Sequence, residues 1–373
     1  MQFRDLGAQY KALKNDIDEG IQAVIDSNAF ILGKPVTELE NKLAEYVGRK
    51  HCVACGNGTD ALQLALMILG VGPGDAVFTS DFTYFASAGS ASILGATPVL
   101  VDIDLNTFNM SPNALEDAIK RIIAEGKLIP KAIIPVDLFG QPADFTNILP
   151  IAKKYGLKVL EDGAQGFGGN INGKMACSFG DISTTSFFPA KPLGCYGDGG
   201  AVFTDDDEVD SRLRSLRAQG KSPVDKYDNR EIGMNSRLDT IQAAILLPKF
   251  KAFVEYELDA VNKAANWYTE RLKGKFATPI ILDGFYSSWA QYTILMENRK
   301  ERDAMQAKLK EHGIPSMIYY PRGLHQQEAY SWMKLTDDMY PNTIEATNTV
   351  LSLPMHPYLT EDIVDAIVEA MTK

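Results

Sequence analysis

Residues 75–101 read DAVFTSDFTYFASAGSASILGATPVLV. Two short runs rich in β-forming residues, 76–79 and 97–101, enclose a segment near 86–94 that has the composition of a helix. The same alternation continues downstream with a helix at 113–124, a strand at 132–136, a helix at 144–155 and a strand that includes Val159. Strands separated by helical segments indicate a mostly parallel sheet with helices on both faces, so the sequence predicts an α/β fold.

The residues before this stretch predict two amphipathic helices and then a strand, turn and helix. Apolar spacing predicts helices over 5–27 and 37–47, and a strand at 51–55 leads through the turn Gly56-Asn-Gly-Thr59 into a helix that opens at Asp60. Free backbone N–H groups and the helix dipole make such a turn a candidate phosphate site, with a plain strand-to-helix connection as the alternative. It has neither the Lys-Ser/Thr pair of a P-loop nor G-x-G-x-x-G spacing.

After residue 200 the order of elements changes. The pattern predicts a helix at 206–219, a loop at 220–230, a helix from the 233–245 segment that Pro248 kinks and that continues toward 273, a strand at 290–296, a helix at 302–312, a strand at 316–320 and a helix at 360–372. We therefore expect a large domain over 1–250 and a smaller α+β domain over 251–373.

The candidate catalytic residue is Lys191, in the segment STTSFFPAKPLGCYGDGGA at 183–201. The lysine lies in a proline-flanked turn, and glycines follow it. Ser186 stands five positions earlier, so one short segment offers a hydroxyl for a phosphate and an amine for a Schiff base, as a pyridoxal phosphate site needs. The alternative is an ordinary surface lysine.

A pyridoxal phosphate site also needs a carboxylate for the ring nitrogen of the cofactor. Residues 158–165, KVLEDGAQ, read as a buried strand that ends at Asp162. Ligands of parallel sheets lie at the carboxyl ends of strands, so Asp162 is the candidate, with a helix N-cap as the other reading. Tyr84 also follows a strand end and could stack on a planar cofactor, although a core or surface aromatic is equally compatible.

Composition excludes several classes of function. The net charge of −11 argues against nucleic acid or an anionic membrane as the main partner. No leader precedes Asp5 and no apolar run approaches the length of a membrane span, so we expect a cytoplasmic protein. The four cysteines form no disulfide framework, and Cys52-Val-Ala-Cys55 has no second pair or ligand-spaced histidines, so we expect buried thiols and no metal site.

Five motifs, in this order and spacing, resemble the DegT/DnrJ/EryC1/StrS family of nucleotide-sugar aminotransferases. They are Gly58-Thr-Asp-Ala-Leu62, Glu161-Asp-Gly-Ala-Gln165, Ser186-Phe-Phe-Pro-Ala-Lys191, Gly197-Asp-Gly-Gly200, and Asn235-Ser-Arg237 with Ile241-Gln-Ala-Ala244. The likeness extends to Phe30-Ile-Leu-Gly33 and to Leu353-Pro-Met-His-Pro357.

The resemblance implies the fold of aspartate aminotransferase, fold type I, in a homodimer with shared active sites. It implies that Lys191 binds pyridoxal 5′-phosphate covalently and moves protons, and that Asp162 holds the pyridinium. The other implied cofactor contacts are Gly58, Thr59 and Ser186 at the phosphate, Gln165 beside the ring hydroxyl, Tyr84 on the ring, and Asn235 from the partner subunit.

The match is closest to enzymes that aminate C3 of a UDP-linked 2-acetamido-2-deoxy-3-oxo-glucuronate for cell-surface polysaccharides, with L-glutamate as donor. The alternative is a dTDP-linked 3-oxo-6-deoxyhexose. Arg237 is the candidate partner for a sugar carboxylate, although an ion pair with Asp239 would explain it equally. Arg322 departs from the apolar residue that relatives commonly carry there, which leaves the sugar contacts of that loop open. The expected substrate-binding residues are Arg237, Tyr320, Arg322, His325, Phe30 and Lys34.

Overall fold

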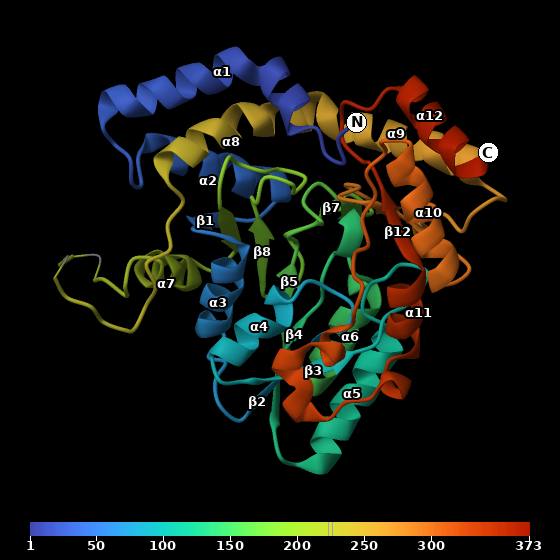
Figure 1. The fold of residues 1–373 in the computed structure, drawn as a ribbon. Helices are drawn as coiled ribbons and strands as arrows, with labels where there is room; N and C mark the ends of the chain where they lie inside the picture. The colour runs from blue at the N-terminus through green and yellow to red at the C-terminus, as the bar shows by residue number, and fades with distance from the viewer. Residues whose placement is uncertain (223, 226) are drawn as a thin grey trace.

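The computed structural model describes residues 1–222, 224–225 and 227–373 (Figure 1). A seven-stranded sheet forms its centre, in the spatial order β1 (His51–Cys55), β9 (Gly200–Thr204), β8 (Ile182–Ser186), β5 (Lys158–Asp162), β4 (Ile129–Ile134), β2 (Asp75–Ser80) and β3 (Thr97–Val101). β8, β5, β4, β2 and β3 pair in parallel, whereas β9 is antiparallel to both neighbours. The expected mostly parallel sheet is confirmed.

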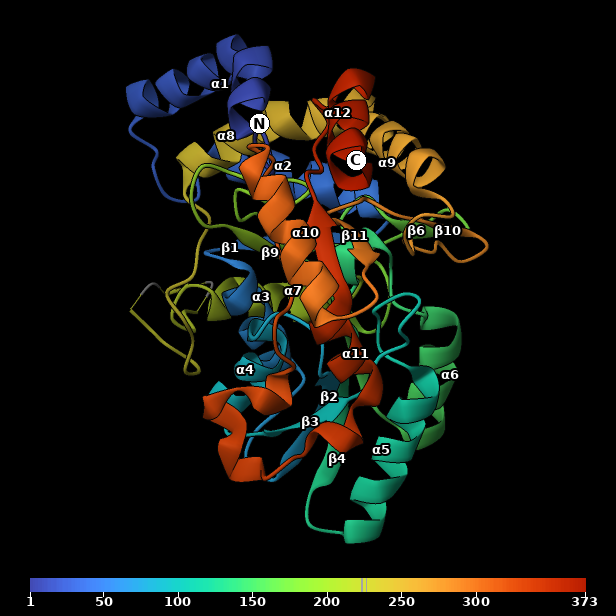
Figure 2. The same cartoon turned by 45° about the vertical axis from the view of Figure 1, so that its right-hand side comes forward.

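Helices cover both faces of this sheet (Figure 1, Figure 2). On one face lie α2 (Lys34–Val47), α5 (Pro112–Glu125), α6 (Phe145–Tyr155) and α8 (Thr240–Ala252), and on the other α3 (Gly58–Ile68), α4 (Ala86–Ile93) and α7 (Asp207–Leu216). β1 shows the reason: Cys52 and Ala54 pack toward α2 and α8, and Val53 and Cys55 toward α3 and α7. Alternate residues of a strand point to opposite faces, so a run without polar residues is buried on both sides.

A second apolar core lies to one side of the sheet. It is formed by α9 (Leu258–Leu272), α10 (Arg299–Glu311) and α12 (Glu361–Thr372) around the antiparallel pair β11 (Tyr292–Leu295) and β12 (Val350–Leu353). α8 runs into α9 through a π-helical turn, Phe253–Glu257, so one helical path links the two cores. α1 (Leu6–Ser27) lies along the outside of α8 (Figure 1). The division into domains at residue 250 stays a prediction.

The structure corrects two of the expected elements. The predicted strand at 316–320 is wrong: only Met317 forms a bridge, with Ser352, because Pro315 and Pro321 flank the segment and limit a longer ladder. The helix expected from the 233–245 segment begins only at Thr240, after extended Asp239, and contains Pro248 without ending there. The departure from α geometry comes later, at 253–257.

Several elements were not expected. They are the three-stranded sheet of β10 (Phe285–Tyr286), β6 (Asn170–Ile171) and β7 (Lys174–Met175), the strand β12, the helix α11 (Pro341–Thr349), and the short 3₁₀ helices Leu138–Gly140, Leu324–Gln326, Glu328–Met333 and Asp337–Met339. Most are two to six residues long, which is too short for a periodic pattern. Among the described residues, no helix is both long and apolar enough to span a bilayer.

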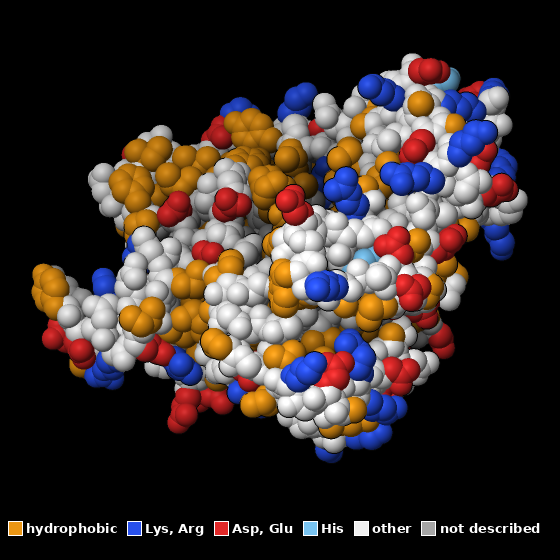
Figure 3. Space-filling model, turned by 60° about the horizontal axis from the view of Figure 1, so that its bottom comes forward, with side chains coloured by type: hydrophobic (Ala, Val, Ile, Leu, Met, Phe, Trp, Pro, Cys, Tyr) orange, Lys and Arg blue, Asp and Glu red, His pale blue; other side chains and the backbone are white. Residues whose placement is uncertain are grey.

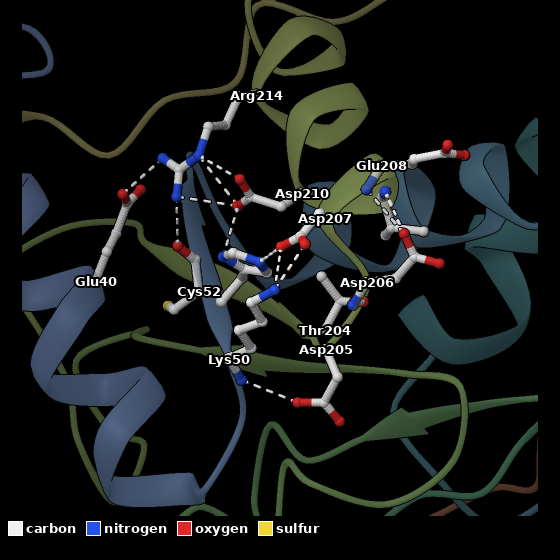
Figure 4. A network of polar contacts seen from close by, with 12 residues as sticks. Glu40, Lys50, Cys52, Thr204, Asp205, Asp206, Asp207, Glu208, Asp210 and Arg214 are labelled. Carbon is white, nitrogen blue, oxygen red and sulfur yellow. Dashed lines mark hydrogen bonds and ion pairs between the residues drawn. The ribbon is translucent and has the colours of Figure 1, made fainter.

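A network of charges ties α7 to the edge of the sheet (Figure 4). The buried Glu40 carboxylate accepts hydrogen bonds from the Ala54 N–H (2.9 Å), Arg217 (2.6 Å) and Arg214 (2.8 Å). Arg214 also donates to the carbonyl of Cys52. Cys52 and Cys55 are buried, as expected, and burial raises the pKa of Cys55 to about 12, which disfavours its thiolate.

Candidate active site

Asp162 is the last residue of β5 and lies buried at the carboxyl end of the sheet. Its carboxylate accepts hydrogen bonds from the Ser87 hydroxyl (2.8 Å) and the Ala164 N–H (3.2 Å). Burial raises the pKa of Asp162, while the Ser87 bond and the positive charge of Lys191 act in the opposite direction. The side chain is therefore a fixed, poorly hydrated acceptor that a cationic N–H group would satisfy.

Lys191 lies in a tight turn between β8 and β9. Its N–H donates to the carbonyl of Phe188 (2.9 Å), and the N–H of Cys195 closes the surrounding loop on the carbonyl of Phe187 (2.8 Å). Burial lowers the pKa of Lys191, the charge of Arg4 lowers it further, and the charge of Asp162 opposes both. A neutral amine is the form that attacks a carbonyl carbon, so this environment favours Schiff-base chemistry.

The glycine turn before α3 meets the end of β8, where a phosphate cradle was predicted. A Cβ on Gly58 would lie 2.7 Å from the Ser186 Cβ, and one on Gly200 would lie 2.5 Å from the Asn57 carbonyl carbon. Only glycine allows this close approach. Asn57 caps α3 by accepting from the Asp60 N–H, so the helix begins beside the Ser186 hydroxyl and points its positive end there.

Gln165 and Tyr320 connect the sheet to the C-terminal part of the chain. The Gln165 side chain accepts from the Phe139 N–H (2.9 Å) and donates to the Tyr320 hydroxyl (3.2 Å). Tyr320 is close enough to Asp162 and Tyr84 for their charges to affect its pKa, which burial raises. Tyr84 itself is 58% exposed, so one face of its ring is free to stack. The structure thus places Tyr320, predicted as a substrate contact, against Gln165, a predicted cofactor contact.

These residues fit a pyridoxal phosphate. The close approach of Gly58 and Ser186 leaves backbone N–H groups and a hydroxyl where an anion could bind, Asp162 would offer a buried carboxylate to the ring nitrogen, and Lys191 would supply the amine. Such a cofactor, when bound, withdraws electrons from the carbon that gains or loses the amino group. Within the described ranges, no three His, Cys, Asp or Glu residues could jointly hold a metal ion.

Sequence reasoning missed two residues at this site. Ser87 binds the Asp162 carboxylate, and a serine in the first turn of α4 carries no signal of that role. Arg4 donates to the carbonyl of Lys191 from the N-terminal segment of the chain. Neither contact follows from a local pattern, since 75 and 187 positions separate the partners.

Four predicted residues gather around the start of α8 instead. Asn235 is exposed and accepts a hydrogen bond from Arg237, while Phe30 accepts at its carbonyl from the Thr240 N–H (2.9 Å) and is followed by exposed Lys34. Within the part of the chain that the structure describes, Arg237 makes no ion pair with Asp239, and none of the four side chains forms a hydrogen bond with Lys191. Buried Ser236 fixes this segment, because its hydroxyl bonds the Gly56 N–H and the Asp60 carboxylate.

The two remaining candidates lie on the segment after Tyr320. His325 is buried, with Nδ1 2.6 Å from Asp81 and Nε2 3.0 Å from Asp337, so both ring nitrogens are occupied. Arg322 is exposed and has no hydrogen bond or ion pair to the described residues, which leaves its guanidinium available to a ligand. Of these two, Arg322 stays the predicted substrate contact, because its side chain is exposed.

Several curated proteins are similar to this chain over nearly its full length. A UDP-2-acetamido-2-deoxy-3-oxo-D-glucuronate aminotransferase of Pseudomonas aeruginosa is 47% identical and covers 100% of this chain and 99% of its own length. A pleiotropic regulatory protein of Geobacillus stearothermophilus is 43% identical (99% and 97%), and a UDP-N-acetyl-3-dehydro-α-D-glucosamine 3-aminotransferase of Acidithiobacillus ferrooxidans 42% (96% and 93%). A dTDP-3-amino-3,6-dideoxy-α-D-galactopyranose transaminase of Aneurinibacillus thermoaerophilus is 38% identical (100% and 98%).

Solved structures share the fold as well. A DegT/DnrJ/EryC1/StrS aminotransferase of Brucella abortus has a TM-score of 0.96 and 47% identity over 100% of this chain and 98% of that one. NtdA of Bacillus subtilis, solved with bound cofactor PMP, has a TM-score of 0.87 and 29% identity over 96% and 81%. The expected fold type I is thus confirmed. The model of the DegT/DnrJ/EryC1/StrS aminotransferase family matches residues 11–372, and the chain belongs to this family.

Proposed function

We propose that this chain transfers an amino group to C3 of UDP-2-acetamido-2-deoxy-3-oxo-D-glucuronate. The observation that carries the proposal is the convergence of Lys191, Asp162 and the Gly58–Ser186 cradle at the carboxyl end of one sheet. A transaminase of this family uses pyridoxal 5′-phosphate, and the residues here fit it. The full-length similarity to the P. aeruginosa enzyme supports the UDP-linked 3-oxo uronate as substrate.

Each residue of the cluster has a proposed role. Lys191 would hold the cofactor through its amine, and the free amine would move a proton at the sugar carbon that gains the amino group. Asp162 keeps the ring nitrogen protonated, because a buried carboxylate favours a cation beside it. Thr59 and Ser186 anchor the phosphate at the start of α3, and Tyr84 covers one face of the ring. L-Glutamate is the proposed amino donor.

The test of Lys191 is direct. Borohydride reduction of the loaded enzyme, followed by peptide mapping, should find the cofactor on Lys191. Lys191→Ala should fold normally but leave the visible absorbance of bound cofactor unchanged when glutamate is added, because the covalent link and the proton carrier are both gone. A cofactor found on any other lysine would refute the assignment.

We propose that the active enzyme is a homodimer in which Asn235 and Arg237 complete the partner's site. Both side chains are available on the surface of one chain and lie beside an exposed apolar run, with Ile25 45%, Phe30 42%, Ile31 51% and Leu32 42% exposed. Figure 3 shows hydrophobic side chains gathered on the part of the molecule that carries α1. A second copy that covers this surface would bury it and bring the two polar side chains to a new site.

Complementation tests the shared site. Lys191→Ala and Asn235→Asp homodimers should both be inactive, and mixed dimers should regain part of the activity in the one site that has both native residues. No recovery after mixing and re-association would contradict the arrangement, provided that mixed dimers are shown to form by mass spectrometry.

The carboxylate of the proposed sugar needs a positively charged partner. Arg322 makes no hydrogen bond or ion pair to the described residues, and Arg237 bonds only the Asn235 side chain, so both guanidinium groups have donors left for this carboxylate. The test measures kcat/KM for the reverse reaction, in which the amino sugar gives its amino group to 2-oxoglutarate. The three sugars compared are the 3-amino uronate, the UDP-linked N-acetylglucosamine analogue and a dTDP-linked 6-deoxy sugar. Arg237→Met should cost the uronate about 2–4 kcal/mol of transition-state binding and the neutral sugars much less, with Arg322→Met as the matched variant. If the native enzyme prefers a neutral sugar, the proposed uronate substrate is wrong.

A further inference from the structure

Arg4, in the N-terminal segment, binds the turn that carries Lys191. Its Nη2 donates to the carbonyl oxygens of Lys191 (2.7 Å) and Pro192 (3.2 Å). The N–H of Lys191 is held by Phe188, so both backbone polar groups of the lysine are fixed, one from each side. Among the described residues, Arg4 is the only charged side chain from before β1 that hydrogen-bonds the turn.

The segment around Arg4 is itself anchored. The Met355 N–H donates to the carbonyl of Phe3 (3.1 Å), and the Phe3 ring packs edge-on against Tyr319 at 6.1 Å between centroids. Asp5 then caps α1 by accepting from the Ala8 N–H (2.8 Å). The backbone that carries Arg4 is therefore tied to the C-terminal part of the chain. From this fixed position its guanidinium bonds the lysine turn, a contact called the clamp below.

The charges around this clamp are few. Asp162 faces Lys191 from β5. Arg4 is faced by Lys249 of α8, by Glu257 of the π-helical turn and by His356, whose pKa burial lowers to about 4, so its ring is neutral at neutral pH. Burial lowers the pKa of Arg4 to about 10, with Glu257 opposing, so the guanidinium stays charged at neutral pH. The positive charge beside Lys191 disfavours a second positive charge on its amine.

We propose that Arg4 is a positioning residue that holds the backbone of Lys191 in register with Asp162 and keeps its amine ready for the cofactor. The inference rests on the proposed role of Lys191 but concerns a residue outside the five motifs. Both bonds come from one nitrogen of a planar guanidinium, which holds its N–H groups in a fixed plane, whereas the N–H groups of an ammonium rotate freely. Arg4→Lys therefore retains the charge and loses the geometry, whereas Arg4→Met loses both.

Arg49 provides the matched control. Its guanidinium also donates to two successive carbonyls, those of Phe179 and Gly180, both at 2.9 Å, and pairs with Asp205 (2.7 Å). These two carbonyls lie before the start of β8 rather than after its end. Arg49→Met should reduce thermal stability at least as much as Arg4→Met, because it also loses the pair with Asp205, and it leaves the lysine turn intact. If the two variants differ in the behaviour of Lys191, the difference comes from the position of the lysine turn and not from a general loss of stability.

Two measurements test the clamp. In protein freed of cofactor, competitive acetylation as a function of pH, read by peptide mass mapping, gives the titration midpoint of Lys191. The midpoint should move upward in Arg4→Met, stay near the native value in Arg4→Lys, and not move in Arg49→Met. In loaded protein, the single-turnover reaction with glutamate should slow by about tenfold or more in both Arg4 variants, because small misplacement of a reacting group is costly.

The outcomes separate this inference from the proposed function. Cofactor trapped on Lys191, with native midpoint and rate in Arg4→Met, would overturn the clamp and leave the role of Lys191 intact. Cofactor trapped on another lysine would overturn the role of Lys191 and the clamp with it. An equal shift of the Lys191 titration midpoint and an equal slowing of the single-turnover reaction in Arg4→Met and Arg49→Met would also refute the clamp, since they would show loosening of the whole fold.

Discussion

Lys249→Met should stabilise the protein at neutral pH. Lys249 lies on α8 with 1% of its surface exposed, and its Nζ has no hydrogen-bond partner among the described residues. The ammonium lies 4.8 Å from the centre of the Tyr196 ring. Burial lowers the pKa of Lys249 to about 8, the charge of Arg4 lowers it further, and Glu257 opposes them. Methionine keeps the length and apolar stem of the side chain and removes the charge.

The magnitude follows from the pKa. Moving the pKa from 10.5 to about 8 makes the charged amine less stable in the folded protein by about 3 kcal/mol. The contact between the ammonium and the Tyr196 ring offsets about 1–2 kcal/mol of this cost, and methionine loses part of that contact. The expected net gain for Lys249→Met is therefore about 1–2 kcal/mol in the free energy of unfolding at pH 7.

The pH dependence makes this prediction specific. The folded pKa lies below the unfolded one, so between about pH 8 and 10.5 the unfolded chain binds more protons and the stability of the native protein rises with pH. The advantage of the methionine variant should thus be largest below pH 8 and shrink toward pH 10.5. Urea unfolding at fixed protein concentration measures it, with the exposed Lys251→Met as control. A variant less stable than native at pH 7, or one with an unchanged pH slope, would refute the reasoning.

Two further changes test other parts of the molecule. Asp162→Asn should reduce turnover by several orders of magnitude while the protein still binds cofactor, because a neutral amide no longer holds the ring nitrogen protonated; absorbance of bound cofactor and steady-state rates measure the two effects, and unaltered turnover would exclude the pairing. Glu40→Ala should lower the free energy of unfolding by about 3–5 kcal/mol, since it leaves the buried Arg217 unpaired; denaturant titration checks this, and a loss below about 1 kcal/mol would show that Arg217 finds another partner.

The parts of the fold that the sequence predicted well are those with strong local patterns. The strands at 51–55 and 97–101 match the structure at both ends, because glycine or charged residues bound a compact apolar run. The strand at 132–136 was displaced from β4 (Ile129–Ile134), since Pro130 and Lys131 break the apolar pattern at its start. The pair β11 and β12 joins residues almost 60 positions apart, and only β11 was expected.

The candidate site likewise contains residues that the sequence predicted and a contact that it did not. Lys191, Asp162, Ser186 and Gly58 lie in short motifs at strand ends, and the structure brings them together. The partner of Gln165 could not be predicted, because Tyr320 comes from a segment 155 positions away whose expected strand does not form. The individual roles of these residues stay predictions until the experiments above are done.

The antiparallel turn of the chain from β8 to β9 has a consequence for folding. Ser186 pairs with Gly200 in a hairpin, and Lys191 lies in its loop. A hairpin needs no crossover helix, so its closure costs less chain entropy than the joining of two parallel strands. The hydroxyl of Ser186 and the amine of Lys191, which we propose to bind the phosphate and the aldehyde of the cofactor, therefore belong to one local unit that can form early, whereas Gly58 joins it only when distant segments of the sheet assemble.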